Sequence, residues 1–160
     1  MPDVQKNATK EGLAFENLYK EVLKESNVSH FGKHDTITKF YDLDLDEPAH
    51  LDFVLPELRV VVELKTMHEW EKKHFQLIPS YAEKHKRGVF SFPNGEMPTF
   101  WYVIERRTHR SALRPKIISR TDRQLQNYNL WYNGQNFHIL LYDHDTMKGL
   151  INETKIARQG

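Results

Sequence analysis

Three charged residues with the types and spacing needed for hydrolytic chemistry lie in one stretch, Leu51 to Thr66. Asp52 is near its start, and Glu63 and Lys65 are near its end. Two close carboxylates can bind a hard cation such as Mg²⁺, which keeps several waters and also takes phosphate oxygens as ligands. Such an ion lowers the pKa of a bound water, and a neighbouring ammonium group stabilises charge on a phosphoryl group. The stretch is therefore a candidate site for phosphoryl chemistry.

The same stretch predicts a β-hairpin that would bring these side chains together. Val-rich runs flank a break at Pro56-Glu57, which is typical of two paired strands. Side chains i and i+2 share one face of a strand, so Glu63 and Lys65 should point the same way. A turn at Pro56-Glu57 places Asp52 opposite residues 61–63, where cross-strand Cβ atoms lie about 5 Å apart.

A solvated strand edge with one weak ion pair is the alternative interpretation of these charges. Against it, residues 60–64 form a nearly continuous apolar run, as expected for a central strand covered on both faces. Charges at the end of such a strand must be paired or must bind a metal. We therefore interpret Asp52 and Glu63 as a metal-binding pair.

The pattern of Asp52, ten further residues and then Glu63-Leu64-Lys65 resembles the signature of the PD-(D/E)XK nuclease superfamily, although Leu51 stands where many members have proline. The resemblance implies Mg²⁺ as the cofactor, with Mn²⁺ able to replace it. It implies that Asp52, Glu63 and the Leu64 carbonyl ligate the metal. It also implies that Lys65 orients or activates the attacking water.

A fourth catalytic residue is implied by the first expected helix, at about residues 10–26, where apolar residues recur at helical spacing. Residues 12–16 read GLAFE and match the Gly-x-x-Phe-Glu segment through which many members lend a carboxylate to the metal site. The resemblance therefore implies that Glu16 joins the site. The alternative is a solvated helix glutamate.

The whole chain predicts an α/β fold of the restriction-endonuclease-like type, with a mixed central sheet of about five strands flanked by helices. Residues 99–105 should pair beside the catalytic strand after a crossover through the helix at 68–87. That helix contains Gln76 and Tyr81, which approximate a Gln-x-x-x-Tyr motif of some members with one residue too many, so they receive no role. Besides the hairpin, strands are expected at 36–45, 99–105, 115–120 and 137–142, with a possible strand at 88–92, and helices at 10–26, 68–87, 122–131 and 145–156.

Positive charge is concentrated in residues 106–123, which hold seven Lys or Arg against one acid in a chain of net charge +1. Positive charge concentrated in one segment is typical of a protein that binds a polyphosphate, and arginine favours bidentate contacts to phosphates or guanine. A solvated charge run is the alternative. The residues expected to bind DNA are Arg106, Arg107, Arg110, Arg114, Lys116 and Arg120.

Composition excludes several other kinds of chemistry. The chain has no cysteine, which excludes disulfides, thiolate catalysis and cysteine-based zinc sites. No apolar run approaches the ~18 residues of a membrane-spanning helix, and the polar N-terminus lacks a signal-peptide core. With 160 residues and no repeat or linker, we expect a single nuclease domain over 1–160, located in the cytoplasm without membrane contact.

The function that these observations favour is a Mg²⁺-dependent DNA endonuclease. It is most similar to a small type II restriction endonuclease that cuts double-stranded DNA as a homodimer. Three alternatives stay open: a structure-specific repair, recombination or phage nuclease such as a junction resolvase, a non-catalytic DNA-binding module of the same fold, and an RNA nuclease. The intact set of Asp52, Glu63 and Lys65 counts against the non-catalytic module.

Overall fold

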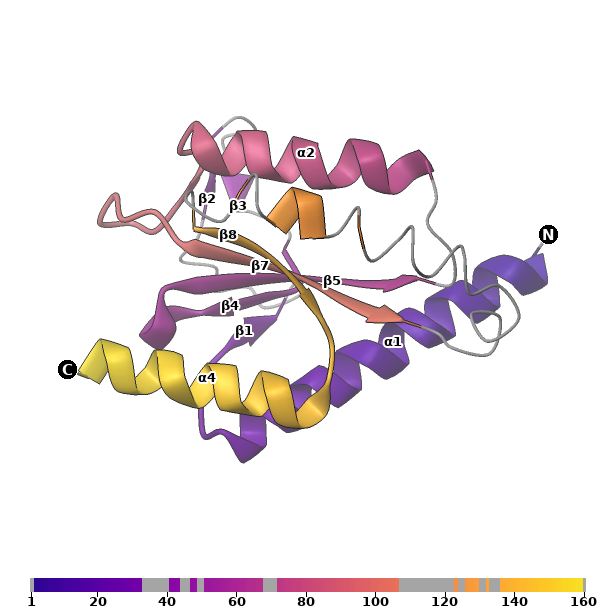
Figure 1. Ribbon diagram of the computed structural model, residues 1–160, viewed down its shortest axis with the longest axis horizontal. Helices are drawn as coiled ribbons and strands as arrows, with labels where there is room; N and C mark the ends of the chain where they lie inside the picture. The colour runs from indigo at the N-terminus through magenta and orange to yellow at the C-terminus, as the bar shows by residue number, and fades with distance from the viewer. Residues whose placement is uncertain are drawn as a thin grey trace.

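The fold is mixed α/β, with a central sheet between two layers of helix (Figure 1). The computed structural model describes residues 2–32, 41–43, 47–48, 51–67, 72–106, 123, 126–129, 132 and 136–159. Its helices are α1 (Pro2–Glu25), α2 (Lys72–Lys86) and α4 (His144–Gln159), with a 3₁₀ turn η1 (Pro56–Leu58). Its strands are β1 (Phe31–Gly32), β2 (Tyr41–Asp42), β3 (Glu47–Pro48), β4 (Phe53–Leu55), β5 (Val60–Met67), β6 (Phe90–Ser91), β7 (Thr99–Arg106) and β8 (Phe137–Leu141).

The central sheet has five strands in the order β1-β4-β5-β7-β8. β4 is antiparallel to β1 and β5, whereas β7 is parallel to both β5 and β8. Helix α2 connects the parallel neighbours β5 and β7 as a crossover. The predicted mixed sheet of five strands flanked by helices is confirmed, and so is the pairing of 99–105 beside β5, the strand that carries Glu63 and Lys65.

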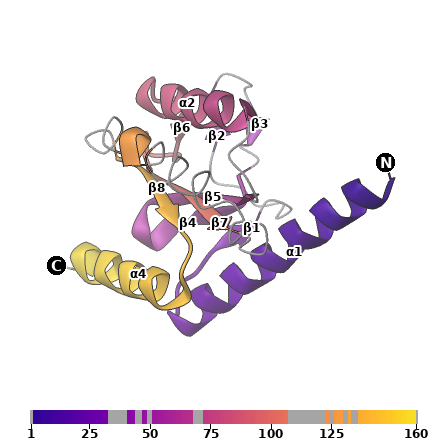
Figure 2. The same ribbon diagram turned by 45° about the vertical axis from the view of Figure 1, so that its right-hand side comes forward.

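Alternation along the central strands separates two hydrophobic cores. Helix α2 covers one face of the sheet, and α1 and α4 cover the other (Figure 2). Under α2, Val61 and Tyr102 pack with Ile78. Their strand neighbours Val62 and Trp101 point to the opposite face, where they belong to the core formed with α1 and α4. This is the period-2 alternation that a sheet buried on both faces requires.

Helix α1 begins earlier than the expected start near residue 10. Its first residue is Pro2, and proline is tolerated in the first turn because its missing N–H has no helical partner there. The predicted end is confirmed, since Asn27 adopts a left-handed conformation (φ 55°) just past the helix. The Asn27 N–H donates to the Lys24 carbonyl and the Val28 N–H to the Leu23 carbonyl, which is the Schellman pattern of a helix C-terminus.

The turn of the hairpin sets the register between β4 and β5. The break at Pro56-Glu57 is the 3₁₀ turn η1, which Arg59 follows in a left-handed conformation (φ 55°). Phe53 then pairs with Val62. The next residue outward, Asp52, therefore lies level with Glu63, as the sequence predicted.

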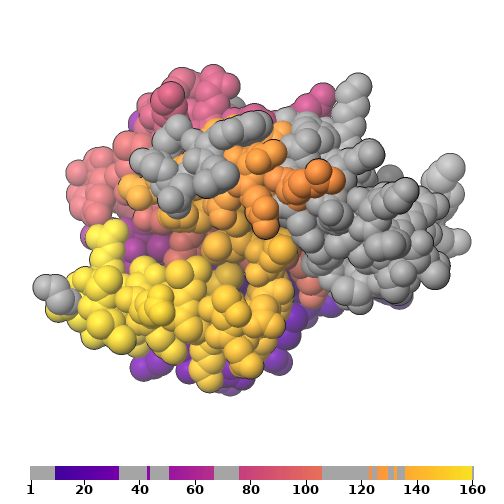
Figure 3. Space-filling view, in the orientation of Figure 1, coloured from indigo at the N-terminus to yellow at the C-terminus, as the bar shows by residue number. Residues whose placement is uncertain are grey.

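Other expected elements are confirmed in part. The strand at 137–142 is β8, and the C-terminal helix is longer than expected; it covers the lower front of the molecule in Figure 3. Residues 123, 126–129 and 132 are helical, in agreement with the helix at 122–131. The expected strand at 115–120 and most of that at 36–45 lie outside the described residues. No helix in the described part of the chain is long and apolar enough to cross a membrane.

A second sheet has the order β3-β2-β6. Strand β2 lies within the strand expected at 36–45 and β6 within the possible strand at 88–92, whereas β3 and the pairing of these strands into a sheet were not expected. Each strand is two residues long, and a segment as short as β3 cannot display the alternation of apolar and polar residues by which strands are recognised in a sequence.

Candidate metal centre

Asp52 and Glu63 come together on the sheet face covered by α2. Asp52 directly precedes β4, and its Oδ2 accepts a hydrogen bond of 2.7 Å from the backbone N–H of Leu64. This bond holds the Asp52 carboxylate against β5, within hydrogen-bonding reach of the Glu63 carboxyl group. Glu63 is only 5% exposed. The predicted carboxylate pair is therefore assembled on rigid backbone in a largely dry environment.

Tyr81 on α2 also contacts the pair, which the sequence analysis missed. Its hydroxyl donates to Glu63 Oε2 at 2.6 Å. Gln76, the other residue of the approximate Gln-x-x-x-Tyr motif, is exposed, so only Tyr81 of the two is shown to contact the carboxylate pair. Helical spacing indicates only the face on which Tyr81 lies, because Ile78 and His85, three residues before it and four residues after it, are buried toward the sheet. It does not indicate the contact with Glu63.

The pKa of Glu63 is raised well above its ordinary value. Burial is the largest cause, followed by the hydrogen bond to Asp52 and its negative charge. The hydrogen bond from Tyr81 and the positive charge of Lys65 act in the opposite direction. Two close carboxylates repel one another when both are ionised, so this site favours either a shared proton or a bound cation.

We therefore expect Glu63→Gln to stabilise the metal-free protein at neutral pH. A carboxyl whose pKa is raised by folding costs stability as the pH rises from its unfolded value through its folded value. Glutamine keeps an acceptor for Tyr81 and carries no charge. Each kcal/mol gained should raise the melting temperature by about 2–4 °C in a domain of this size.

The measurement is thermal unfolding of Glu63→Gln and wild type from pH 4 to pH 8 in EDTA. The advantage of the variant should grow as the pH rises and vanish at the acidic end. The matched variant Glu57→Gln changes a carboxylate that accepts a bond from the Ser29 N–H and whose pKa is lowered, so it should show the opposite sign. A constant difference across this pH range would contradict the raised pKa of Glu63.

Lys65 and Leu64 have the placements that the sequence predicted. Lys65 shares the face of Glu63, and its charge acts on that carboxyl group. The Leu64 side chain packs into the opposite core. Because the N–H and C=O of one strand residue point to the same side, the Leu64 carbonyl points toward the β4 side, where Asp52 accepts its N–H.

These oxygens fit Mg²⁺, which takes one or two protein carboxylates and completes its shell with water and phosphate. Within the described residues, no group of three or more His, Cys, Asp or Glu could hold a metal. The candidate centre is thus a pair of carboxylates with a neighbouring carbonyl. The described part of the chain has no centre made of three carboxylates or of histidines.

The other predicted site residues are not joined to this pair by the described contacts. Glu16 is half-buried on α1, and no described contact joins it to Asp52 or Glu63, so its role stays a prediction. Arg106 is the last residue of β7. The predicted DNA contacts at Arg107, Arg110, Arg114, Lys116 and Arg120 lie outside the described residues.

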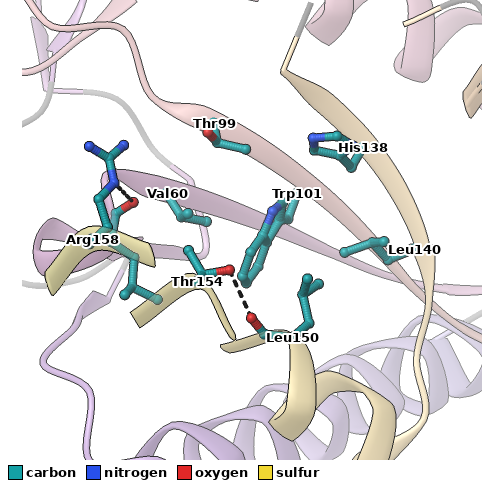
Figure 4. Close-up of a pocket in the computed structure, with 9 residues that line it drawn as sticks. Val60, Thr99, Trp101, His138, Leu140, Leu150, Thr154 and Arg158 are labelled. Atoms are coloured by element: carbon teal, nitrogen blue, oxygen red, sulfur yellow. Dashed lines mark hydrogen bonds between the residues drawn. The ribbon is translucent and has the colours of Figure 1, made fainter. Parts of the chain in front are cut away.

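A pocket of about 270 Å³ opens on the opposite face, between α4 and the central strands (Figure 4). Trp101 and His138 line it from β7 and β8, and Arg158 lines it from α4. Arg158 Nε donates to the Leu58 carbonyl and Thr154 Oγ1 to that of Leu150. The sheet separates this pocket from Asp52 and Glu63, so it is not part of the candidate centre.

Comparisons with known proteins do not assign the chain to a family. No protein-family model matches the chain, and searches of curated proteins and of solved structures found no match either.

Proposed function

We propose that this chain is a Mg²⁺-dependent DNA endonuclease of the PD-(D/E)XK superfamily with the restriction-endonuclease-like fold. The observation that carries the proposal is the convergence of Asp52 and Glu63, with Lys65 on the same face as Glu63. They lie on a hairpin that forms part of a mixed five-stranded sheet between helices. The proposal is thus supported by the Asp-x10-Glu-x-Lys pattern and by the closeness of two carboxylates, which metal-dependent phosphodiester hydrolysis requires.

Each residue would have a distinct role in phosphodiester hydrolysis. Asp52, Glu63 and the Leu64 carbonyl would hold Mg²⁺ or Mn²⁺, which when bound supplies a Lewis acid beside the scissile phosphate. Lys65 would place its ammonium group against the attacking water or a phosphate oxygen. Tyr81 would hold the Glu63 carboxylate in place through its hydrogen bond.

A nucleic acid fits the candidate centre as substrate because the basic segment begins beside it, and the resemblance to restriction endonucleases favours DNA. Lys65 pairs with Ile104 across the parallel ladder, and Met67 pairs with Arg106. The basic residues 106–123 therefore follow directly from the strand end next to Lys65. A homodimer of the type II restriction class would present two such centres to the two strands of double-stranded DNA in the cytoplasm.

The test is incubation of supercoiled plasmid with the protein in Mg²⁺ and in EDTA. Nicked and linear products in Mg²⁺ alone are expected, and discrete bands would identify a restriction enzyme. Cleavage confined to branched DNA would favour the junction-resolving alternative, and cleavage confined to RNA would favour the ribonuclease. Binding of DNA without cleavage of any substrate would overturn the enzyme proposal in favour of a non-catalytic module.

Charge reversal at Arg110 and Arg114 is expected to weaken DNA binding and reduce its salt dependence. Each lost phosphate contact should lower the slope of log K against log[salt] by about 0.9. Fluorescence anisotropy in Ca²⁺ at several salt concentrations measures this slope. The double change Lys20→Glu and Lys24→Glu on the exposed side of α1 is the matched charge reversal. Equal slopes for the arginine variants and wild type would place the DNA surface elsewhere.

A further inference from the structure

The hydroxyl of Tyr102 is buried and has no hydrogen-bond partner among the described residues. The whole Tyr102 residue is 0% exposed. An unpaired hydroxyl in such a place lowers the stability of the fold, and buried polar groups without a partner are rare. This orphan donor therefore calls for an explanation.

The position of Tyr102 indicates which group it serves. It lies on β7 directly beside Glu63 of β5 in the parallel ladder, so the two residues share the face under α2. The Tyr102 ring also lies next to that of Tyr81, with ring centroids 6.1 Å apart. Glu63 is thus placed between a tyrosine of the helix above it and a tyrosine of the neighbouring strand.

The carboxyl groups of Glu63 and Asp52 are hydrogen-bond acceptors whose charges act on this hydroxyl. The hydroxyl itself is buried away from bulk solvent. Burial, and then the charges of Glu63 and Asp52, raise the pKa of Tyr102, so the phenol stays a proton donor. An ionised carboxylate has about four acceptor positions, and the described side-chain donor to Glu63 is Tyr81 alone.

We propose that Tyr102 is a positioning residue of the metal centre, whose hydroxyl donates to the Glu63 carboxylate when a divalent cation is bound. Tyr81 and Tyr102 then hold Glu63 from two sides and leave its remaining lone pairs for the cation. The inference rests on the proposed function, because it needs the cation site. It goes further by giving that site a second supporting donor.

The test is Tyr102→Phe, which removes the hydroxyl and keeps the ring. In other metal centres, loss of a residue that hydrogen-bonds to a metal ligand lowers the metal affinity by about 10–100-fold, and we expect a loss in this range here. Calorimetric titration with Mn²⁺ should therefore give a Kd at least about tenfold above that of wild type. In EDTA the melting temperature should be unchanged or higher, since an unpaired buried hydroxyl is lost.

The matched control is Tyr19→Phe, a tyrosine that is also 0% exposed but lies in the opposite core, where its hydroxyl donates to Met147 Sδ at 3.3 Å. Its Mn²⁺ affinity should equal that of wild type. Equal Mn²⁺ affinity of Tyr102→Phe and wild type would overturn the role of Tyr102 and leave the proposed function standing. A lower melting temperature of Tyr102→Phe in EDTA would reveal another partner and also overturn it. A wild type that binds no Mn²⁺ would overturn both proposals.

Discussion

Lys65→Ala is expected to lower the rate of DNA cleavage by about 10²–10³-fold, the usual cost of removing one group that stabilises charge in a transition state. Lys65 lies two residues after Glu63 on the same strand face, and its charge acts on that carboxyl. It is not a metal ligand, so the loss should fall on catalysis and leave metal binding and DNA binding in place.

Single-turnover cleavage of plasmid, with DNA affinity measured in Ca²⁺, separates these effects. Thr66→Ala, a neighbouring change on the other face of β5, is the matched control and should cleave at nearly the wild-type rate. Lys65→Arg keeps the charge and alters its geometry, so it should recover only part of the activity. Cleavage by Lys65→Ala at the wild-type rate would remove Lys65 from the catalytic set.

Asp52→Asn is expected to abolish cleavage by removing the metal. Asparagine keeps an oxygen that can accept the Leu64 N–H, so the hairpin should retain its geometry. The charge that repels Glu63 is gone, so the metal-free variant should melt at the wild-type temperature or above it. Its gain from Mg²⁺ should be small because half of the carboxylate pair is missing.

Thermal melting across a Mg²⁺ titration measures this gain. At a Mg²⁺ concentration of about 100 Kd, linkage gives wild type ~2.7 kcal/mol, or roughly 5–10 °C in a domain of this size. The variant should still bind DNA in EDTA, because the substitution removes a negative charge that would repel the DNA phosphates. If Mg²⁺ raised the melting temperature of both proteins equally, Asp52 would not belong to the metal site.

The elements around the site were readable from the sequence because they carry strong local patterns. The Val-rich strand before Glu63 is buried on both faces, and the proline break set a turn from which the neighbourhood of Asp52 and Glu63 followed. The strands at 99–105 and 137–142 are long apolar runs, and they are β7 and β8. In each case the pattern of apolar residues along the chain was enough to predict a strand.

The supporting residues could not be read in this way, because they depend on tertiary placement. Tyr81 reaches Glu63 only through the docking of α2 over the sheet, and Tyr102 lies beside Glu63 only through the register of β5 with β7. Periodicity marks both as core aromatics and gives no sign of a polar role. The position of Glu16 relative to the site depends likewise on how α1 crosses the sheet.

The most direct test of the metal centre is a crystal structure of the protein soaked in Mn²⁺, with data collected at the manganese absorption edge. We expect anomalous density for manganese between Asp52 and Glu63, with carboxylate oxygens of both residues and the Leu64 carbonyl among the ligands of the ion. The same soak of Asp52→Asn should lack that density. A wild-type crystal with no manganese at these oxygens, or with manganese bound elsewhere, would contradict the assignment of this hairpin as a metal-dependent nuclease centre.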